Sequence, residues 1–192
     1  MTETETPLPR ALIVDDEKEV ADAYALRLRG QCDVQTAYGG QTALELLDEP
    51  VVDIVLLDRH MPGMSGDDVL AKLDEREFCG KVIMVTAIDP GFDVLDMPFD
   101  DYLCKPIDRE DVRAAVSQQC EVLGYELLGE YFTAESKRRV IAAELPGDER
   151  ADHDGYREVE QECDALRERI RRLLDDSAAL LEAFDAVGRE GR

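Results

Sequence analysis

Five side chains suited to metal or phosphoryl chemistry stand directly after apolar segments of this sequence. The segment RALIV precedes Asp15 and Asp16, and the segment VVDIVLL precedes Asp58. The segment KVIMV precedes Thr86, and the segment DYLC precedes Lys105. Four apolar segments therefore deliver three carboxylates, one hydroxyl and one cation.

Three carboxylates held in one place repel one another, so the group predicts a cation between them. Mg²⁺ prefers oxygen ligands and typically takes one or two carboxylates together with phosphate oxygens. We therefore expect Asp15, Asp16 and Asp58 to bind Mg²⁺. With its charge screened by the metal, Asp58 could attack phosphorus and form an acyl phosphate. Thr86 and Lys105 would then contact the phosphoryl oxygens.

Strand and helix patterns alternate between residues 10 and 120. Strands are expected at 10–16, 33–37, 52–58, 81–87 and 101–106. Helices are expected at 17–30, 39–50, 65–77 and 108–123. Nearly continuous apolar strands that alternate with helices predict an α/β domain with a parallel sheet covered on both faces. Since ligands bind outside the carboxyl ends of such strands, the five polar side chains should converge on one edge.

Four segments of the chain together resemble the receiver domain of two-component response regulators. They are IVDDE (13–17), VLLDRHMPGMSG (55–66), MVTA (84–87) and DDYLCKP (100–106). The resemblance implies a flavodoxin-like, doubly wound sheet of five parallel strands in the order 2-1-3-4-5. It places the receiver domain at residues 8–121. Each of Asp15, Asp16, Asp58, Thr86 and Lys105, taken alone, also fits a purely structural role. The prediction of a receiver domain depends on their occurring together.

The resemblance also implies a role for each matching residue. Asp58 would take a phosphoryl group from the phosphohistidine of a sensor histidine kinase, which makes the chain a phosphoprotein. Asp15 and Asp16 would hold Mg²⁺ together with Asp58 and the main-chain carbonyl of His60.

Thr86 and Lys105 would contact the phosphoryl group, and Tyr102 would swing inward as a switch when Thr86 moves. The alternative for Tyr102 is a packed aromatic side chain. The segment 88–99 lacks the usual Ala-Gly-Ala-rich pattern of the family and is short by a few residues. We therefore expect a truncated helix there, which affects how the signal leaves the domain.

From about residue 122 the sequence becomes helical, with a Pro-Gly interruption at 146–155. A heptad-like stripe follows at Val159, Cys163, Leu166, Ile170, Leu173, Ser177, Leu180, Phe184 and Val187. Two helices are predicted over 122–188, either folded back as a hairpin or associated as a coiled coil between two chains. This tail resembles the HalX module of halophilic archaea.

Composition limits the environment and the partners. The net charge is −23, from 45 acidic and 22 basic residues, which disfavours binding to nucleic acid. It favours a cytoplasm at high salt, and the alternative is an acidic protein of an ordinary cell with a basic partner. No apolar run approaches the ~20 residues of a membrane span, and the acidic N-terminus is unlike a secretory signal. The five widely spaced cysteines are interpreted as free thiols. A cytoplasmic location is expected.

These features predict a response regulator that switches the conformation or association of a helical output domain on phosphorylation. The alternative is a DNA-binding transcriptional regulator that acts through the tail. A phosphatase of the haloacid dehalogenase kind is disfavoured, because His60 stands where that chemistry needs a second acid. The chain is thus expected not to be an enzyme, beyond losing its own phosphoryl group slowly. The expected partners are a sensor histidine kinase, a second copy of the chain and a downstream protein.

Overall fold

The computed structural model describes residues 7–48, 51–87 and 90–186 of the 192-residue chain. The chain divides into two units, one formed by Leu8–Cys120 and the other by Glu121 and the residues that follow, together with the N-terminal residues up to Pro7. Within the described ranges, no helix is long and apolar enough to cross a membrane. Each unit is described by itself.

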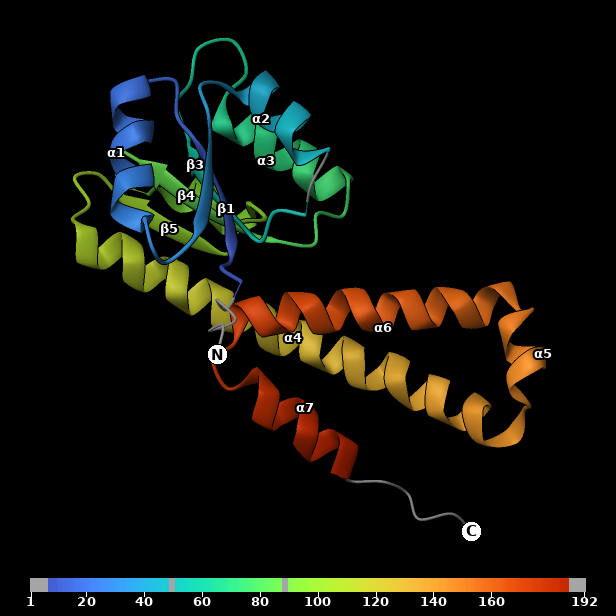
Figure 1. Ribbon diagram of the computed structural model, residues 1–192. Helices are drawn as coiled ribbons and strands as arrows, with labels where there is room; N and C mark the ends of the chain where they lie inside the picture. Colours follow the sequence, from blue (N-terminus) through green and yellow to red (C-terminus); the bar gives the residue numbers. More distant parts are fainter. Residues whose placement is uncertain (1–6, 49–50, 88–89, 187–192) are drawn as a thin grey trace. The chain divides into compact units, whose positions relative to one another are not determined.

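A five-stranded parallel sheet forms the centre of the first unit (Figure 1). Its strands are β1 (Arg10–Val14), β2 (Asp33–Ala37), β3 (Ile54–Asp58), β4 (Lys81–Thr86) and β5 (Asp101–Cys104). Their order in the sheet is β2-β1-β3-β4-β5, and every neighbouring pair is parallel. The predicted fold class and strand order are therefore confirmed.

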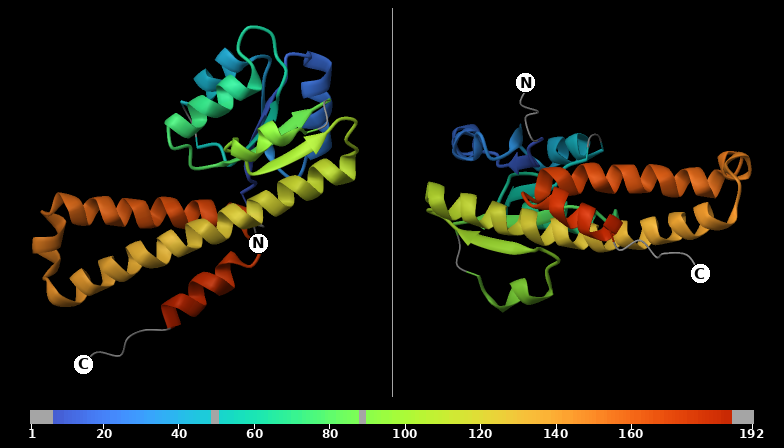
Figure 2. Two further views of the ribbon diagram at one scale, coloured as in Figure 1. Left: turned by 180° about the vertical axis from the view of Figure 1, so that it is seen from behind. Right: turned by 60° about the horizontal axis from the view of Figure 1, so that its bottom comes forward.

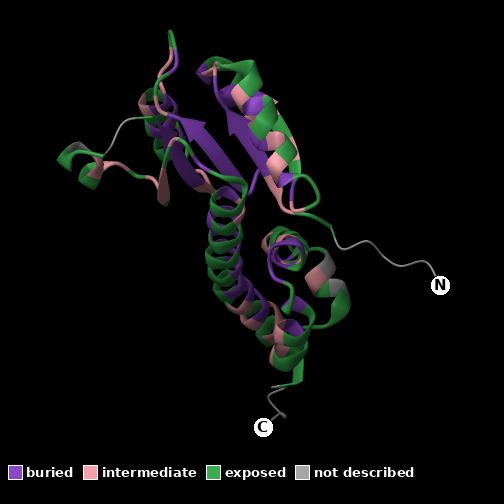
Figure 3. Cartoon of the chain, turned by 90° about the vertical axis from the view of Figure 1, so that its left-hand side faces the viewer, coloured by how far each residue is buried: buried purple, intermediate pink, exposed green. Residues whose placement is uncertain are grey.

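Helices cover both faces of this sheet. The helices of the unit are α1 (Lys18–Leu28), α2 (Gly40–Leu47), α3 (Gly66–Glu75) and the first part of α4 (Arg109–Glu144). Figure 3 shows the strands as mostly buried and the outer helix surfaces as exposed. Every residue of β3 is buried, whereas exposure alternates along the edge strand β2. This difference explains why the β3 sequence is continuously apolar up to its terminal aspartate.

The connection between β4 and β5 contains one short 3-10 helix among its described residues. This helix, η1 (Phe92–Asp96), confirms the truncated helix expected there, while residues 88–89 lie outside the described ranges. Phe92 is 91% exposed and Leu95 is 76% exposed, so this segment leaves large apolar side chains uncovered.

The second unit is helical and begins inside α4. After the remainder of α4 come α5 (Gly147–Ala151), α6 (Asp154–Leu173) and α7 (Ser177–Ala186). The helix expected to begin near residue 122 is continuous with the last receiver helix, and α5 lies inside the predicted linker. Both views in Figure 2 show the second part of α4 beside α6, which is the hairpin alternative of the prediction.

The prediction of one helix through the whole heptad-like stripe is wrong. α6 ends at Leu173, Leu174 is extended, and α7 begins at Ser177. Leu174 is 3% exposed, and a Cβ atom on Gly124 would lie 2.6 Å from its Cδ2 atom. Its side chain therefore packs closely on α4 at the break. The adjacent pair Asp175 and Asp176, which have low helix propensity, follows at that point.

A buried carboxylate joins the helices of the second unit. Glu135 is 2% exposed, and its oxygens accept hydrogen bonds from Arg138 at 2.6 and 2.7 Å and from Arg139 at 2.8 Å. The bond to Arg138, opposed by burial and assisted by Arg139, lowers the pKa of Glu135 to about 2. Arg139 also pairs with Asp185 of α7. Burial of this charge is tolerated because two cations and several hydrogen bonds compensate it.

Candidate phosphoacceptor site

Three of the predicted residues meet at the carboxyl edge of the sheet. Asp15 follows β1, Asp58 ends β3 and Lys105 follows β5. The ammonium nitrogen of Lys105 lies 2.8 Å from Oδ2 of Asp15 and 2.6 Å from Oδ1 of Asp58. Asp15 is 2% exposed and Asp58 is 7% exposed, so both carboxylates are largely removed from water. Parallel pairing of the strands thus brings together residues that lie far apart in the sequence.

Main-chain amides hold the other oxygens of the two carboxylates. The N–H of His60 donates to Oδ2 of Asp58 at 2.8 Å, and the N–H of Glu17 donates to Oδ1 of Asp15 at 2.9 Å. Each aspartate therefore bonds to the backbone two residues further on, a local turn that fixes its orientation. Both carboxylates are oriented before any ligand arrives.

The pKa values of Asp58 and Lys105 are both shifted from their ordinary values. Burial raises the pKa of Asp58, and the nearby charge of Asp15 adds to this effect, while the hydrogen bond from Lys105 opposes it. Burial alone would lower the pKa of Lys105, but its hydrogen bonds to Asp15 and Asp58 raise it overall. One ammonium thus leaves the buried Asp58 carboxylate incompletely compensated, and a further cation beside it would be favourable.

Thr86 and Tyr102 lie on the neighbouring strands. Thr86 ends β4 and is fully buried; its Oγ1 is 3.5 Å from Nδ1 of His60, and its carbonyl accepts from the N–H of Lys105 at 2.6 Å. Tyr102 of β5 is partly buried, with its ring centre 5.4 Å from that of Phe99. The peptide bond between Lys105 and Pro106 is cis. Thr86 is at the predicted edge, and Tyr102 packs among apolar side chains.

The loop after Asp58 contains a residue that the sequence analysis did not assign to the site. A Cβ atom on Gly66 would lie 2.2 Å from the carbonyl oxygen of Asp58 and 2.8 Å from Cα of Arg59. The N–H of Gly66 donates to the carbonyl of Arg59 at 2.9 Å, and Ser65 caps the following helix, α3. Because Gly66 has no side chain, the backbone at the start of α3 can pass directly beside the carbonyl group of Asp58. The signal was present in the sequence as the final glycine of the second matching segment.

The donor chemistry of the site suits a hard divalent cation. Asp15 and Asp58 both bind the same ammonium, and the partly exposed Asp16 follows Asp15 directly. Carboxylate oxygens are the ligands that Mg²⁺ prefers. Within the described ranges, no group of three or more His, Cys, Asp or Glu side chains is arranged around a shared metal position. The predicted metal ligands Asp15, Asp16, Asp58 and His60 therefore stay predictions.

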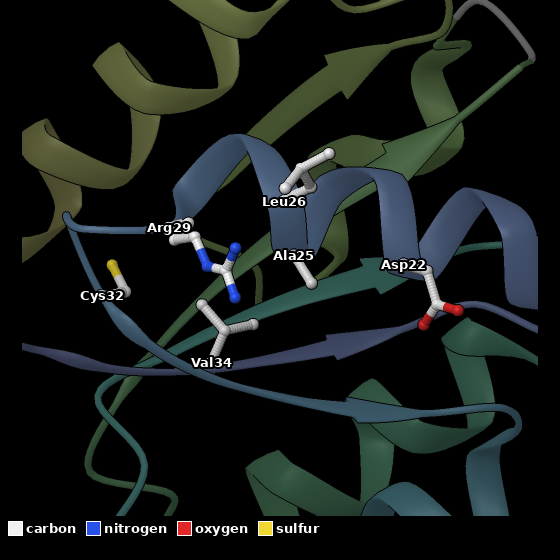
Figure 4. Close-up of a pocket in the computed structure, with 6 residues that line it drawn as sticks. All are labelled: Asp22, Ala25, Leu26, Arg29, Cys32 and Val34. Atoms are coloured by element: carbon white, nitrogen blue, oxygen red, sulfur yellow. The ribbon is translucent and has the colours of Figure 1, made fainter.

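A separate hollow of about 390 Å³ lies beside α1 and β2 (Figure 4). Its lining residues are Asp22, Ala25, Leu26, Arg29, Cys32 and Val34. None of the predicted site residues is among them. Burial raises the pKa of the Cys32 thiol to about 12, so this thiol is not a reactive nucleophile at neutral pH.

A buried aspartate ends a central parallel strand, and a second acid and a lysine follow neighbouring strands, at the edge where doubly wound α/β domains bind their ligands. Residues 11–117 match the model of the response regulator receiver domain, and residues 121–187 match the HalX domain. The chain therefore belongs to the response regulator receiver family and carries a HalX domain behind the receiver.

Known relatives agree with this assignment. A protein of Haloferax volcanii whose name refers to transcriptional regulation is 37% identical over 93% of this chain and 35% of its own length. The transcriptional regulatory protein CutR of Streptomyces coelicolor is 38% identical over 56% of this chain and 51% of its own. The chain thus spans from about a third to half of these curated relatives. A solved receiver domain protein of Methanospirillum hungatei is 25% identical, with a TM-score of 0.58 over 62% of this chain and 98% of that one.

Proposed function

We propose that this chain is the phosphorylated component of a two-component system and that Asp58 accepts the phosphoryl group from a sensor histidine kinase. One observation carries the proposal most directly. A single lysine, Lys105, hydrogen-bonds to both Asp15 and Asp58 at the carboxyl edge of a receiver-type sheet. This arrangement places a nucleophilic oxygen, a second acid and a fixed cation beside one another.

The proposed transfer uses groups that already lie at the carboxyl edge of the sheet. An oxygen of Asp58 forms a bond to phosphorus as the bond from phosphorus to the donor's histidine nitrogen breaks. Asp15, Asp16, Asp58 and the carbonyl of His60 would hold Mg²⁺, which supplies charge neutralisation for the phosphoryl oxygens when bound. Lys105 offers its ammonium to the same oxygens. The N–H of His60, already 2.8 Å from Oδ2 of Asp58, keeps the acceptor oriented.

The phosphoryl group carries about −1.5 to −2 charges in place of the single negative charge of the Asp58 carboxylate, and this larger charge at a buried position must be compensated locally. Thr86, whose hydroxyl now lies 3.5 Å from His60, is the hydroxyl at this edge that can turn towards the new oxygens. Movement of Thr86 changes the space beside the neighbouring strand, so Tyr102 is proposed as the side chain that follows. The signal then reaches the surface near β5 and α4.

The output is proposed to act through protein association, as a change in the pairing of the HalX helices or in a homodimer, with a downstream protein as the target. DNA binding is the second candidate, because two curated relatives are named for transcriptional regulation. The basic side chains of the tail weigh against it. Arg138 and Arg139 both bond to Glu135, and Arg167 bonds to the hydroxyl of Tyr131. Arginines bound within the protein are less available for phosphates.

No metabolic activity is proposed for the site. His60 stands two residues after Asp58, where a phosphatase of the aspartate-nucleophile type would carry a second acid. Slow hydrolysis of the acyl phosphate by water is proposed to reset the protein. The proposed location is the cytoplasm of a halophilic cell, consistent with the net charge of −23.

Labelling with a small acyl-phosphate donor tests the proposal. The full chain with Mg²⁺ should gain one acid-stable, alkali-labile phosphoryl group, and Asp58→Asn should gain none. Asp74→Asn, which removes an exposed carboxylate on α3, is the matched control and should label as the unaltered chain does. Equal labelling of Asp58→Asn would refute the assignment of Asp58. A gel shift at high salt, with and without the donor, separates DNA binding from a protein-association output.

A further inference from the structure

A cavity of about 300 Å³ lies in the second unit, where the helical hairpin turns. Figures 1 and 2 show α5 at this turn, between the end of α4 and the beginning of α6. The lining residues are Lys137, Arg138, Ile141, Leu145, Arg150, His153, Gly155, Tyr156 and Val159. This cavity, which we name the hairpin cavity, has no part in the receiver chemistry described above. Its volume is at the lower end of the range of small-molecule sites.

Apolar side chains on the hairpin cavity remain partly exposed. Ile141 of α4 is 39% exposed, and Leu145, which directly follows the end of α4, is 41% exposed. The N–H of Leu145 donates to the carbonyl of Ile141 at 3.0 Å. Val159 and the buried Tyr156 face the same cavity from α6. Leaving apolar surface in water costs about 25 cal/mol per Å², so a ligand that covers it gains free energy. The occupant must therefore have an apolar part.

The residues that line the hairpin cavity have a net charge opposite to that of the chain. Lysine and arginine make up 22 of 192 residues but three of the nine that line the cavity, namely Lys137, Arg138 and Arg150. None of these nine residues is acidic, although the chain contains 45 acids. The cavity surface itself is mostly apolar, and Arg138 is paired with Glu135, so Lys137 and Arg150 supply the positive charge that favours an anionic group at the edge of the cavity.

Arg150 identifies where the anion would bind. Its Nε atom is buried and has no hydrogen-bond partner, while its guanidinium lies 5.7 Å from the ring centre of Tyr156. Arg138, by contrast, is already bonded to Glu135. A buried donor without a partner is costly, and a carboxylate would satisfy it with a charge-assisted hydrogen bond.

We propose that the hairpin cavity binds a small amphipathic carboxylate, with its apolar chain against Ile141, Leu145 and Val159 and its carboxylate on Arg150. The occupant is a small molecule with one carboxylate and a chain of medium length. Binding would tie α4, α5 and α6 together, so the second unit would respond to a metabolite as well as to the receiver.

Calorimetric titration of the full chain with octanoate tests this site. Saturable binding of one octanoate per chain is expected. Val159→Phe fills the cavity and should abolish binding, whereas Val140→Phe, at a 53% exposed position outside the cavity, should leave it unchanged. Arg150→Gln should weaken binding about tenfold, since a charge-assisted bond is lost. Arg157→Gln, which removes the same charge from the exposed face of α6, should have no effect.

Three results would overturn the proposal. The first is absence of saturable binding to a folded chain, verified by circular dichroism. The second is binding of 1-octanol as tight as that of octanoate, which would show that the cation has no role. The third is a dimer, detected by mass in solution, that Val159→Phe disrupts while octanoate fails to bind, which would assign the cavity to a second copy of the chain.

Discussion

The ammonium nitrogen of Lys105 lies 2.6 Å from Oδ1 of Asp58, although 47 positions separate the two residues in the sequence. The same nitrogen is 2.8 Å from Oδ2 of Asp15, so one ammonium binds both carboxylates. If Mg²⁺ binds to these carboxylates as proposed, it must weaken or displace at least one of the two ion pairs. Under the proposal, the lysine therefore compensates the carboxylates in the absence of the metal and competes with the metal.

Replacement of Lys105 separates these two roles. Lys105→Met removes the competing cation and leaves Asp15 and Asp58 more strongly repelled, so Mg²⁺ should bind more tightly, by about tenfold. Phosphorylation should nevertheless become slower, by about tenfold or more, because a fixed charge on the phosphoryl oxygens is lost. Titration of Mg²⁺ followed by amide NMR shifts measures the first effect, and labelling with an acyl phosphate measures the second.

Lys72→Met is the control for this variant, because Lys72 is an exposed residue of α3 and its loss removes the same charge. It should change neither Mg²⁺ affinity nor phosphorylation. If Lys105→Met binds Mg²⁺ more weakly than the unaltered chain, the proposal that lysine and metal compete is refuted.

Gly66→Ala should impair the acceptor without touching a charged group. The added Cβ atom would lie 2.2 Å from the carbonyl oxygen of Asp58, so the backbone at the acceptor must move. We expect phosphorylation to slow by about tenfold or more, since small displacements of reacting groups are costly. Gly129→Ala is the contrast, because its Cβ meets nothing within 4 Å and it lies inside α4. That substitution should leave labelling unchanged and stabilise the second unit by about 0.8 kcal/mol.

Asp58→Asn should stabilise the receiver unit at neutral pH. Burial raises the pKa of Asp58, so the folded state holds its proton to higher pH than the unfolded chain does. Stability is therefore lost as pH rises from the ordinary aspartate pKa through the folded value, and the loss is complete above it. Asparagine carries no charge, so the variant does not lose stability as pH rises through this range. Thermal unfolding at neutral pH and near pH 3 should show a gain of a few degrees in Tm only at neutral pH.

Asp74→Asn provides the comparison here, since this exposed carboxylate should give no gain at either pH. A lower Tm for Asp58→Asn than for the unaltered chain at neutral pH would show that the ion pair with Lys105 outweighs the cost of burial.

Strand-end acids could be predicted because their position follows from a short-range pattern. Apolar segments with the length typical of parallel strands predicted where each strand ends. The residues directly after them, Asp15, Asp58 and Lys105, could therefore be placed at the carboxyl edge of the sheet. The role of Gly66 depends on an approach of two backbone segments that no periodicity records. The hydrogen bonds between Lys105 and both aspartates likewise depend on side-chain packing in three dimensions.

The tail shows the limit of periodicity more clearly. The heptad spacing continues through Ser177 and Phe184, yet α6 ends at Leu173 and α7 begins anew at Ser177. Close packing of Leu174 against Gly124, which are distant in sequence, accompanies the break. The spacing of apolar residues along the sequence contains no information on this contact. The helix predicted through the heptad-like stripe was therefore too long.

Glu135→Gln should destabilise the second unit in a manner that depends on pH. The pKa of Glu135 falls to about 2 in the folded chain, below its ordinary value of 4.5. Its ion pairs therefore stabilise fully above pH 4.5, and this contribution is lost as pH falls towards 2. Removing the charge leaves Arg138 and Arg139 without their carboxylate and should cost about 3 kcal/mol at neutral pH. Hydrogen exchange of α4 and α6 peptides, read by mass spectrometry, measures the loss.

Glu130→Gln removes an exposed carboxylate of α4 and should leave this exchange unchanged at every pH. A loss for Glu135→Gln that is as large at pH 2 as at pH 7 would exclude the ion pairs as its cause.

Phe184→Ala should weaken the attachment of α7 to α4. The ring of Phe184 stacks on Phe132 with centres 4.1 Å apart, and the guanidinium carbon of Arg139 lies 4.9 Å from the centre of the Phe184 ring. Loss of the ring removes both contacts and should cost about 2 kcal/mol of local stability.

Limited proteolysis of Phe184→Ala should accordingly cut first in the 174–176 connection, while the receiver unit stays intact. Glu182→Ala, which alters an exposed side chain of the same helix, should be cut as slowly as the unaltered chain. Because Leu181 also packs inward, with 5% exposure, α7 should keep part of its attachment. Cleavage at the same rate in Phe184→Ala and Glu182→Ala would mean that Leu181, and not the aromatic stack, holds α7 in place.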